Sequence, residues 1–265
     1  MSRVKVEGRP WRPSFILICN KKLITISFIL SLLFISGLWA RKYPEWFLYP
    51  DKYPDIVVGY NYRGSSAKDD AAANFCVFEH SMMMGDLYFY SETEKRSSDY
   101  YYYYDKSRFE LVRDSLICLD TYILNTLTMD IIRAYGFSDT ELSSAVLSVE
   151  ALPIPDWADK NAYESGNYIF GVGAYTSAGN DVDAWKTAEE RSIYSMLMFY
   201  STRFTGTKYL FKEYDTDIYL RSQVIHGHYE LKNISIIERY HDMDQNMVYV
   251  LSKINKSNIR TAQKK

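Results

Sequence analysis

Ile56–Tyr60 reads IVVGY, and Ile169–Tyr175 reads IFGVGAY. Each of these short apolar runs follows a triplet of proline, an acidic residue and tryptophan, at Pro44–Trp46 (PEW) and at Pro155–Trp157 (PDW). Runs of β-branched and aromatic residues of this length are typical of strands. An alanine-bearing segment follows each run, so the chain carries one strand-then-helix pattern twice.

The two alanine-bearing segments share a stripe of residues at helical spacing that changes from small to large. Its members are Ala67, Ala71, Phe75, Phe78 and Met82 in the first segment and Ala184, Ala188, Ser192, Met196 and Phe199 in the second. We expect the small ends to let each helix approach a glycine-bearing strand closely, at Gly59 in the first segment and at Gly171 and Gly173 in the second. Gly85 is expected to end the first helix.

The ends of the two patterns also match. Ile131–Tyr135 and Val146–Ser148 resemble Ile236–Tyr240 and Val250–Ser252, each pair separated by a polar turn. Each unit therefore has the order β, α, an optional second α, and three β. Consecutive hairpins indicate antiparallel sheets, and the sequence predicts an α+β fold of two tandem two-layer modules, each a sheet covered by one or two helices.

These patterns place the first module at 43–150 and the second at 153–256. The chain has 265 residues, which suits two domains of roughly 100 residues each, and such a domain can bury a core without metals or disulfides. The formal net charge of −2 gives no reason to expect nucleic acid as a partner. The polar, basic end at 257–265 is predicted to be a disordered tail.

Leu23–Ala40 is a run of eighteen residues without a charge, directly after a pair of lysines. That length is just enough to span a bilayer, and the positive charges of the basic segment 1–22 indicate that this segment stays in the cytoplasm. A cleaved signal peptide is the alternative, but Leu38 stands where a small residue is wanted before a cleavage site. We expect an uncleaved transmembrane signal anchor with both modules outside the cytoplasm.

Cysteine is sparse in this chain. Cys76 and Cys118 both lie in the first module, so a disulfide between them is one possibility. The alternative, which we favour, is that both are buried small hydrophobes. Cys19 precedes the apolar run without the small residues that a lipidation site needs.

The combination of a Pro-acid-Trp triplet, a strand containing Val-Gly and an alanine-rich helix resembles a bacterial envelope family. The family comprises small surface lipoproteins that share a module with the N-terminal domain of flagellar assembly protein T. The matching residues are Pro44, Trp46, Gly59 and Ala71 in the first copy and Pro155, Trp157, Gly171, Gly173, Ala184 and Ala188 in the second. The resemblance implies an extracytoplasmic, non-enzymatic role in assembling the envelope or a surface structure. Because no cysteine stands where the family carries its lipid, anchoring through Leu23–Ala40 is favoured.

His226 and His228 are the nearest approach to a metal pair, because residues two apart on a strand project to the same face. A solvated strand face is the plainer interpretation, and we predict no metal or cofactor. Gly171 and Gly173 do not form a nucleotide loop, since Thr176 stands where the third glycine is needed. No serine elbow is present, so an enzyme is not expected.

Five consecutive tyrosines are the most unusual local feature: Tyr100, Tyr101, Tyr102, Tyr103 and Tyr104. One interpretation is an aromatic surface that binds a partner protein or a glycan. The other is a strand at a sheet edge whose alternate rings pack on the sheet.

The sequence thus predicts a membrane-anchored, extracytoplasmic interaction or assembly module of the bacterial cell envelope, either periplasmic or at the surface. Its expected partners are the membrane, through Leu23–Ala40, and other envelope proteins or a second copy of itself. Binding to peptidoglycan or another cell-wall glycan is the alternative. A metal-dependent enzyme using His226 and His228 is a third, less favoured hypothesis.

Overall fold

The computed structural model of the chain describes residues 41–61, 66–90, 95–125, 130–177, 181–204 and 222–261. The side chains of 85–90, 95–100, 202–204 and 222–227 are not part of that description. The predicted basic segment 1–22 and anchor 23–40 lie outside the described residues. Within the described ranges, no helix has both the length and the apolar character needed to cross a membrane.

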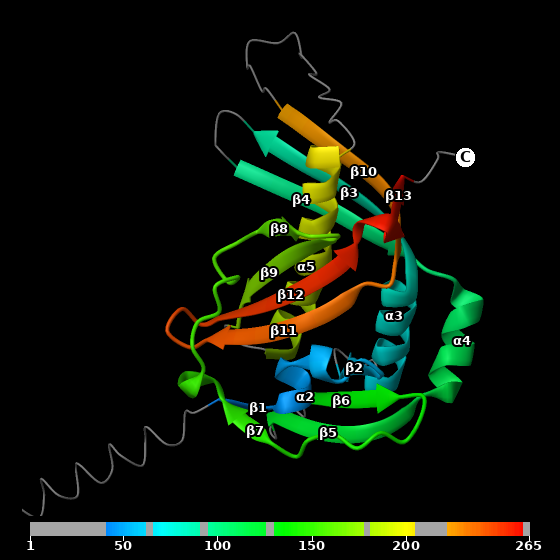
Figure 1. The fold of residues 1–265 in the computed structure, drawn as a ribbon, viewed down its shortest axis with the longest axis vertical. Coiled ribbons are helices and arrows are strands. Elements are labelled where there is room, and N and C mark those ends of the chain that lie inside the picture. Colours follow the sequence, from blue (N-terminus) through cyan, green and yellow to red (C-terminus); the bar gives the residue numbers. More distant parts are fainter. Residues whose placement is uncertain are drawn as a thin grey trace, which may run out of the picture. The chain divides into compact units, whose positions relative to one another are not determined.

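Groups of antiparallel strands are separated along the chain by helices of different lengths (Figure 1). The first half contains β1 (Lys42–Pro44), α2 (Glu45–Leu48), η1 (Pro50–Lys52), β2 (Ile56–Tyr60), α3 (Ala67–Glu79), β3 (His80–Tyr90), β4 (Lys95–Tyr103), α4 (Lys106–Ser115), β5 (Ile117–Asn125), β6 (Asp130–Gly136), β7 (Val146–Ser148) and η2 (Val149–Ala151). The second contains β8 (Ala162–Ser165), β9 (Tyr168–Thr176), α5 (Asp181–Phe204), β10 (Ser222–Lys232), β11 (Ser235–Asp242), β12 (Met247–Asn255), η3 (Lys256–Asn258) and β13 (Ile259–Thr261). The predicted α+β class is confirmed.

Two of the sheets repeat one connectivity. In the sheet β2-β6-β5, the strand before helix α3, which is β2, pairs with β6, the second strand of the hairpin β5-β6. In the sheet β11-β12-β9-β8, the strand before helix α5, which is β9, pairs with β12, the second strand of the hairpin β11-β12. A β-bulge interrupts both hairpins, between Cys118 and Asp120 in β5 and between Ile236 and Glu238 in β11. The bulges fall at the same place relative to the neighbouring strands, so the two sheets share register as well as strand order.

This pairing corrects the predicted alignment of the two ends. Ile131–Tyr135 lies in β6, which occupies the place of β12, whereas the prediction matched it to Ile236–Tyr240 in β11. Val146–Ser148 forms β7 and pairs with β1 in a separate two-stranded ladder. Among its described residues, the first module therefore has no third strand of the predicted kind in its main sheet.

The ranges 43–150 and 153–256 are joined by a shared sheet and a shared core. β3 from the first range pairs along its whole length with β10 from the second, and β4 and β13 complete that sheet (Figure 1). One cluster of buried residues includes Trp46 and Phe47 together with Trp185 and Val248. The chain from Arg41 onward forms one compact unit, and a division into two tandem modules is not confirmed.

The first long helix begins as predicted and ends earlier. The hydroxyl of Ser66 accepts a hydrogen bond of 3.1 Å from the backbone N–H of Asp69, which caps α3. The helix stops at Glu79, whereas the prediction continued it to Gly85. Met82, which was predicted to be helical, lies in β3. Tertiary contacts explain the early end of the helix, because the segment after Glu79 pairs as a strand with β4 on one side and with β10 on the other.

The C-terminal end is also more ordered than predicted. Within the predicted tail 257–265, Ile259–Thr261 forms β13, which pairs antiparallel with β10. Ile259 is buried, and this apolar contact with the core accounts for the ordering of the segment.

Candidate functional site

A buried ion pair lies where the two predicted modules meet. Glu189 on α5 accepts hydrogen bonds from Nε and Nη2 of Arg239 on β11, with 3.0 Å between Nε and Oε1. The hydroxyl of Tyr60 donates to the same oxygen at 2.6 Å, and Nη1 of Arg239 donates to the carbonyl oxygen of Phe47 at 2.6 Å. Because both charges are almost completely buried, they depend on these partners.

The ion pair fixes the first half of the chain to the second. Tyr60 and Phe47 belong to the first half, whereas Glu189 and Arg239 belong to the second. The guanidinium also lies over the ring of Phe47, with 4.5 Å to the ring centroid. Burial raises the pKa of Tyr60 well above its ordinary value, so the tyrosine remains a neutral donor.

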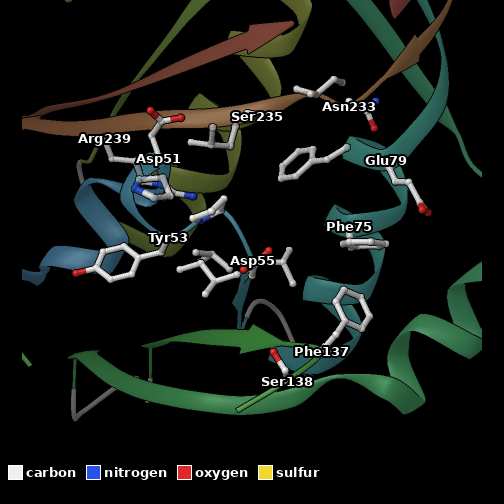
Figure 2. Close-up of a pocket in the computed structure, with 18 residues that line it drawn as sticks. Asp51, Tyr53, Asp55, Phe75, Glu79, Phe137, Ser138, Asn233, Ser235 and Arg239 are labelled. Atoms are coloured by element: carbon white, nitrogen blue, oxygen red, sulfur yellow. The ribbon is translucent and has the colours of Figure 1, made fainter. Parts of the chain in front are cut away.

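A pocket of about 530 Å³ lies between β2, α3 and β11, with Arg239 at one end (Figure 2). Phe75 and Phe137 lie at the other end, where their rings meet edge to face with centroids 4.8 Å apart. Tyr53, Phe78 and apolar residues of the two strands supply most of the remaining walls, and the polar residues Ser138, Asn233 and Ser235 also line the pocket. The volume and the aromatic lining are those of a small-ligand site.

Three carboxylates border this pocket, and two of them have cationic partners. Asp51 lies 2.8 Å from Nζ of Lys253, and Glu79 accepts two hydrogen bonds from the guanidinium of Arg108. Asp55 is exposed, and within the described parts of the chain it makes no ion pair. The mouth of the pocket therefore carries one uncompensated negative charge.

Tyr100, Tyr101, Tyr102 and Tyr103 lie on β4, the end strand of the sheet β13-β10-β3-β4, and Tyr104 directly follows that strand. The hydroxyl of Tyr102 donates to the carbonyl oxygen of Glu190 on α5 at 3.1 Å, and Tyr104 packs beside Phe109. Tyr101 and Tyr103, in contrast, are 59% and 55% exposed. The predicted edge strand with alternating rings is confirmed for Tyr101, Tyr102 and Tyr103, whereas Tyr104 lies beyond the strand and the side chain of Tyr100 lies outside the description.

The exposed tyrosines continue into an apolar strip on the neighbouring strand. Met82 on β3 is paired with Tyr103 and is 45% exposed, and Met84 is paired with Tyr101. Met83 faces the opposite side and is fully buried, as strand alternation requires. The strip thus consists of Met82, Met84, Tyr101 and Tyr103.

The weak metal candidates lie near this strip. His228 on β10 is partly buried and is paired with Met84, whereas the side chain of His226 is not described. Nε2 of His80 lies 2.7 Å from the carboxylate of Glu230. The described residues contain no group of three His, Cys, Asp or Glu that could hold a metal ion.

The residues of the repeated motif occupy structural positions. Ala184 and Ala188 are fully buried on α5, the helix that packs on β9. A Cβ at Gly173 would overlap the carbonyl oxygen of Ala188, one at Gly171 would overlap that of Ser192, and one at Gly59 would overlap that of Ala67. The predicted close approach of helix and strand is confirmed in both halves.

The two tryptophans of the motif make equivalent hydrogen bonds. Trp46 Nε1 donates to Asp120 at 2.7 Å, and Trp157 Nε1 donates to Glu238 at 2.9 Å. Pro44 and Pro155 precede these tryptophans, and Pro44 immediately precedes α2. These contacts hold the triplets against the hairpins.

The two described cysteines are both free. Cys76 is buried, as predicted, whereas Cys118 is exposed on β5, so the prediction of burial is wrong for Cys118. Its position in an outer strand of the three-stranded sheet explains the exposure.

Sequence reasoning did not find the residues around the pocket. Glu189 lies in the charged stretch Ala188–Arg191 of a helix, and Arg239 lies in a strand of mixed polarity. Glu189 lies four residues after Trp185 and four residues before Ile193, so it shares a helix face with these two buried apolar residues. That spacing is the signal that could have indicated a buried carboxylate.

Comparison with protein-family models, with curated proteins and with solved structures finds no match to this chain.

Proposed function

We propose that the protein is a non-enzymatic interaction module of the bacterial cell envelope that docks partners through β4. The observation that carries this proposal is the exposure of Tyr101 and Tyr103, 59% and 55%, on the end strand of a sheet. Tyrosine is enriched in protein interfaces because its ring buries a large area while its hydroxyl keeps a polar contact. Met82 and Met84 extend the same surface with side chains that adapt to a partner.

The backbone of β4 supports the same proposal. Its inner edge pairs with β3 from Met82 to Tyr90, and its other edge has no partner among the described strands. An end strand presents N–H and C=O groups to which an extended segment can add. A partner strand beside Tyr101 and Tyr103 would gain main-chain hydrogen bonds and aromatic contacts together.

The location is part of the proposal. The uncharged run Leu23–Ala40 would anchor the chain in a membrane with the residues after it outside the cytoplasm, in the periplasm or at the surface. The resemblance to the surface-lipoprotein family is consistent with this location. The partners would be other envelope proteins or a second copy of the chain.

We also propose that the two halves descend from one copied unit. The support is the matched set of features in the two sheets: strand order, bulge position, tryptophan-to-carboxylate hydrogen bond and glycine-to-helix contact. After duplication, β3, β4 and β10 would have joined the copies into one body, and β4 would be the element that the first copy added for docking.

Site-specific photocrosslinking in the native envelope tests the docking proposal. A benzophenone amino acid replaces Tyr101 or Tyr103, and the matched control replaces Tyr168, a 42% exposed tyrosine on β9. We expect protein adducts from positions 101 and 103 and none from position 168. Equal adducts at all three positions, or none at 101 and 103, would overturn the proposal.

Binding to a cell-wall glycan is the second candidate, because Tyr101 and Tyr103 lie two residues apart on one strand face. Their positions are spaced by about 7 Å along the strand, so one glycan chain could contact both rings. Co-sedimentation of the protein with purified sacculi tests this function. Tyr101→Ser with Tyr103→Ser should abolish sedimentation, and an unchanged fraction in the pellet would exclude this surface.

A further inference from the structure

We propose that the pocket between β2, α3 and β11 binds an organic cation carried on an apolar body, such as an alkylammonium group. This site is separate from the exposed strip on β4 and goes beyond the docking function. The proposal depends on the shape of the cavity, the chemistry of its walls and the charge at its mouth.

The walls fit the apolar body of such a ligand. The cavity of about 530 Å³ is large enough for a short alkyl chain with a bulky head group. Phe75, Phe78 and Phe137 give it aromatic surfaces, and Phe137 is 46% exposed at the rim. Aromatic faces attract ammonium groups through their quadrupoles while they also bury apolar surface.

The charge at the mouth selects for a cation. Asp51 and Glu79 are balanced by Lys253 and Arg108, which leaves the exposed carboxylate of Asp55 without an ion pair in the described chain. An ammonium group beside Asp55 would complete the pairing of the carboxylates around the pocket. The same group would stand near the aromatic rings of the rim.

Arg239 does not reverse this preference, although it carries a positive charge at the inner end. Both of its contacts to Glu189 are made inside the protein, and its Nη1 donates to the carbonyl oxygen of Phe47. An anionic ligand would therefore find a compensated arginine at the inner end and carboxylates at the mouth. Such a ligand is disfavoured at both ends of the pocket.

Isothermal titration calorimetry with three hexyl probes tests the charge preference on the full chain. The probes are hexyltrimethylammonium, hexanol and hexanoate, which share the apolar body and differ in charge. We expect the ammonium to bind about two- to fivefold more tightly than hexanoate, the ratio that one favourable exposed charge contact gives. Equal affinity for the three probes, or tighter binding of hexanoate, would overturn the proposal.

Two pocket variants and one control locate the binding. Asp55→Asn should weaken binding of the ammonium about two- to fivefold and leave binding of hexanol unchanged. Phe137→Leu keeps an apolar wall and removes the ring, so it should weaken the ammonium about threefold. Asp159→Asn, at an exposed carboxylate outside the pocket, should change neither affinity. Because Asp55 and Phe137 are exposed, both variants should fold, and unchanged ammonium affinity in both would contradict the site.

The same chemistry could come from a free amine or from a lysine side chain of a polypeptide. A pentapeptide with a central lysine between leucines, compared with the same peptide carrying acetyl-lysine, separates the two sources. Tighter binding of the lysine peptide than of hexyltrimethylammonium would identify a polypeptide ligand, and the reverse order a free amine. Both outcomes support a cation site, whereas equal binding of the lysine and acetyl-lysine peptides would contradict it. Because the docking test uses other residues, failure of either proposal leaves the other standing.

Discussion

The indole Nε1–H of Trp157 donates a hydrogen bond of 2.9 Å to the carboxylate of Glu238. Trp46 makes the equivalent bond of 2.7 Å to Asp120. Each tryptophan closes a Pro-acid-Trp triplet, and each carboxylate directly follows a β-bulge. The two bonds therefore hold equivalent triplets to equivalent hairpins, and they explain why tryptophan rather than another aromatic residue ends each triplet.

Trp157→Phe should destabilise the protein by about 1–3 kcal/mol, because it leaves the carboxylate of Glu238 without its donor. Burial already raises the pKa of Glu238, and the indole bond lowers it, so loss of the bond should raise that pKa further. Urea unfolding measures the stability, and Trp46→Phe should give a loss of similar size. Glu238→Gln is the control, since its amide oxygen can still accept the bond. A larger loss in the control than in Trp157→Phe would contradict this role.

Gly173→Ala should be severely destabilising, by about 3 kcal/mol, because the added methyl group overlaps the backbone of Ala188 and forces α5 away from β9. Gly166→Ala is the matched control. Gly166 has a φ of +58° and open space around its Cα, so only the backbone strain of about 1 kcal/mol should appear. Thermal unfolding of both variants checks the difference, and equal losses would argue against close packing at Gly173.

The local patterns of the sequence were enough to predict most long elements of the second half, but they did not predict the short strands β8 and β13. β9, α5, β11 and β12 follow the expected runs, because each combines a clear period with turn residues at its ends. The segment from His80 to Met84 was misassigned because its three methionines fit a helix as well as a strand. Pairing with β10, far along the chain, decides its state, and no local pattern contains that information.

The two candidate sites also differ in how far the sequence alone reveals them. The tyrosine run was evident from the sequence because its composition is unusual. The pocket was not evident, since its walls come from β2, α3, β11 and the turn at Phe137. Glu189 and Arg239 have the composition of solvated residues, and only the meeting of the two halves buries them.

Glu189→Gln should cost about 3–5 kcal/mol of stability, because it leaves the buried guanidinium of Arg239 without a counter-charge. The double variant Glu189→Leu with Arg239→Leu should lose less stability than the sum of the losses in Glu189→Leu alone and Arg239→Leu alone. A double-mutant cycle by urea unfolding measures this coupling. The exposed pair Glu79 and Arg108 is the control, with an expected coupling of about 0–1 kcal/mol. Coupling as small at the buried pair as at the exposed pair would contradict its role in joining the halves.

His241 on β11 is buried within a separate chain of hydrogen bonds. Its Nδ1 lies 2.9 Å from the hydroxyl of Tyr43, and its Nε2 lies 3.1 Å from the hydroxyl of Ser177. Ser177 in turn donates to Asn246 at 2.5 Å, next to the turn between β11 and β12. Burial is the main cause that lowers the pKa of His241 from 6.5 to about 4, and the charge of nearby Arg41 contributes to the same shift.

Acidification should therefore destabilise the protein between pH 6.5 and pH 4, since over this range the unfolded chain binds a proton at His241 that the folded chain does not. The free energy of unfolding should fall by up to about 1.4 kcal/mol per pH unit from this residue. Urea unfolding at pH 7 and pH 5 measures the fall. His241→Gln should start from lower stability and lose this part of the pH dependence, whereas His80→Gln, at an exposed histidine, should keep it. An unchanged slope in His241→Gln would show that other groups cause the acid sensitivity.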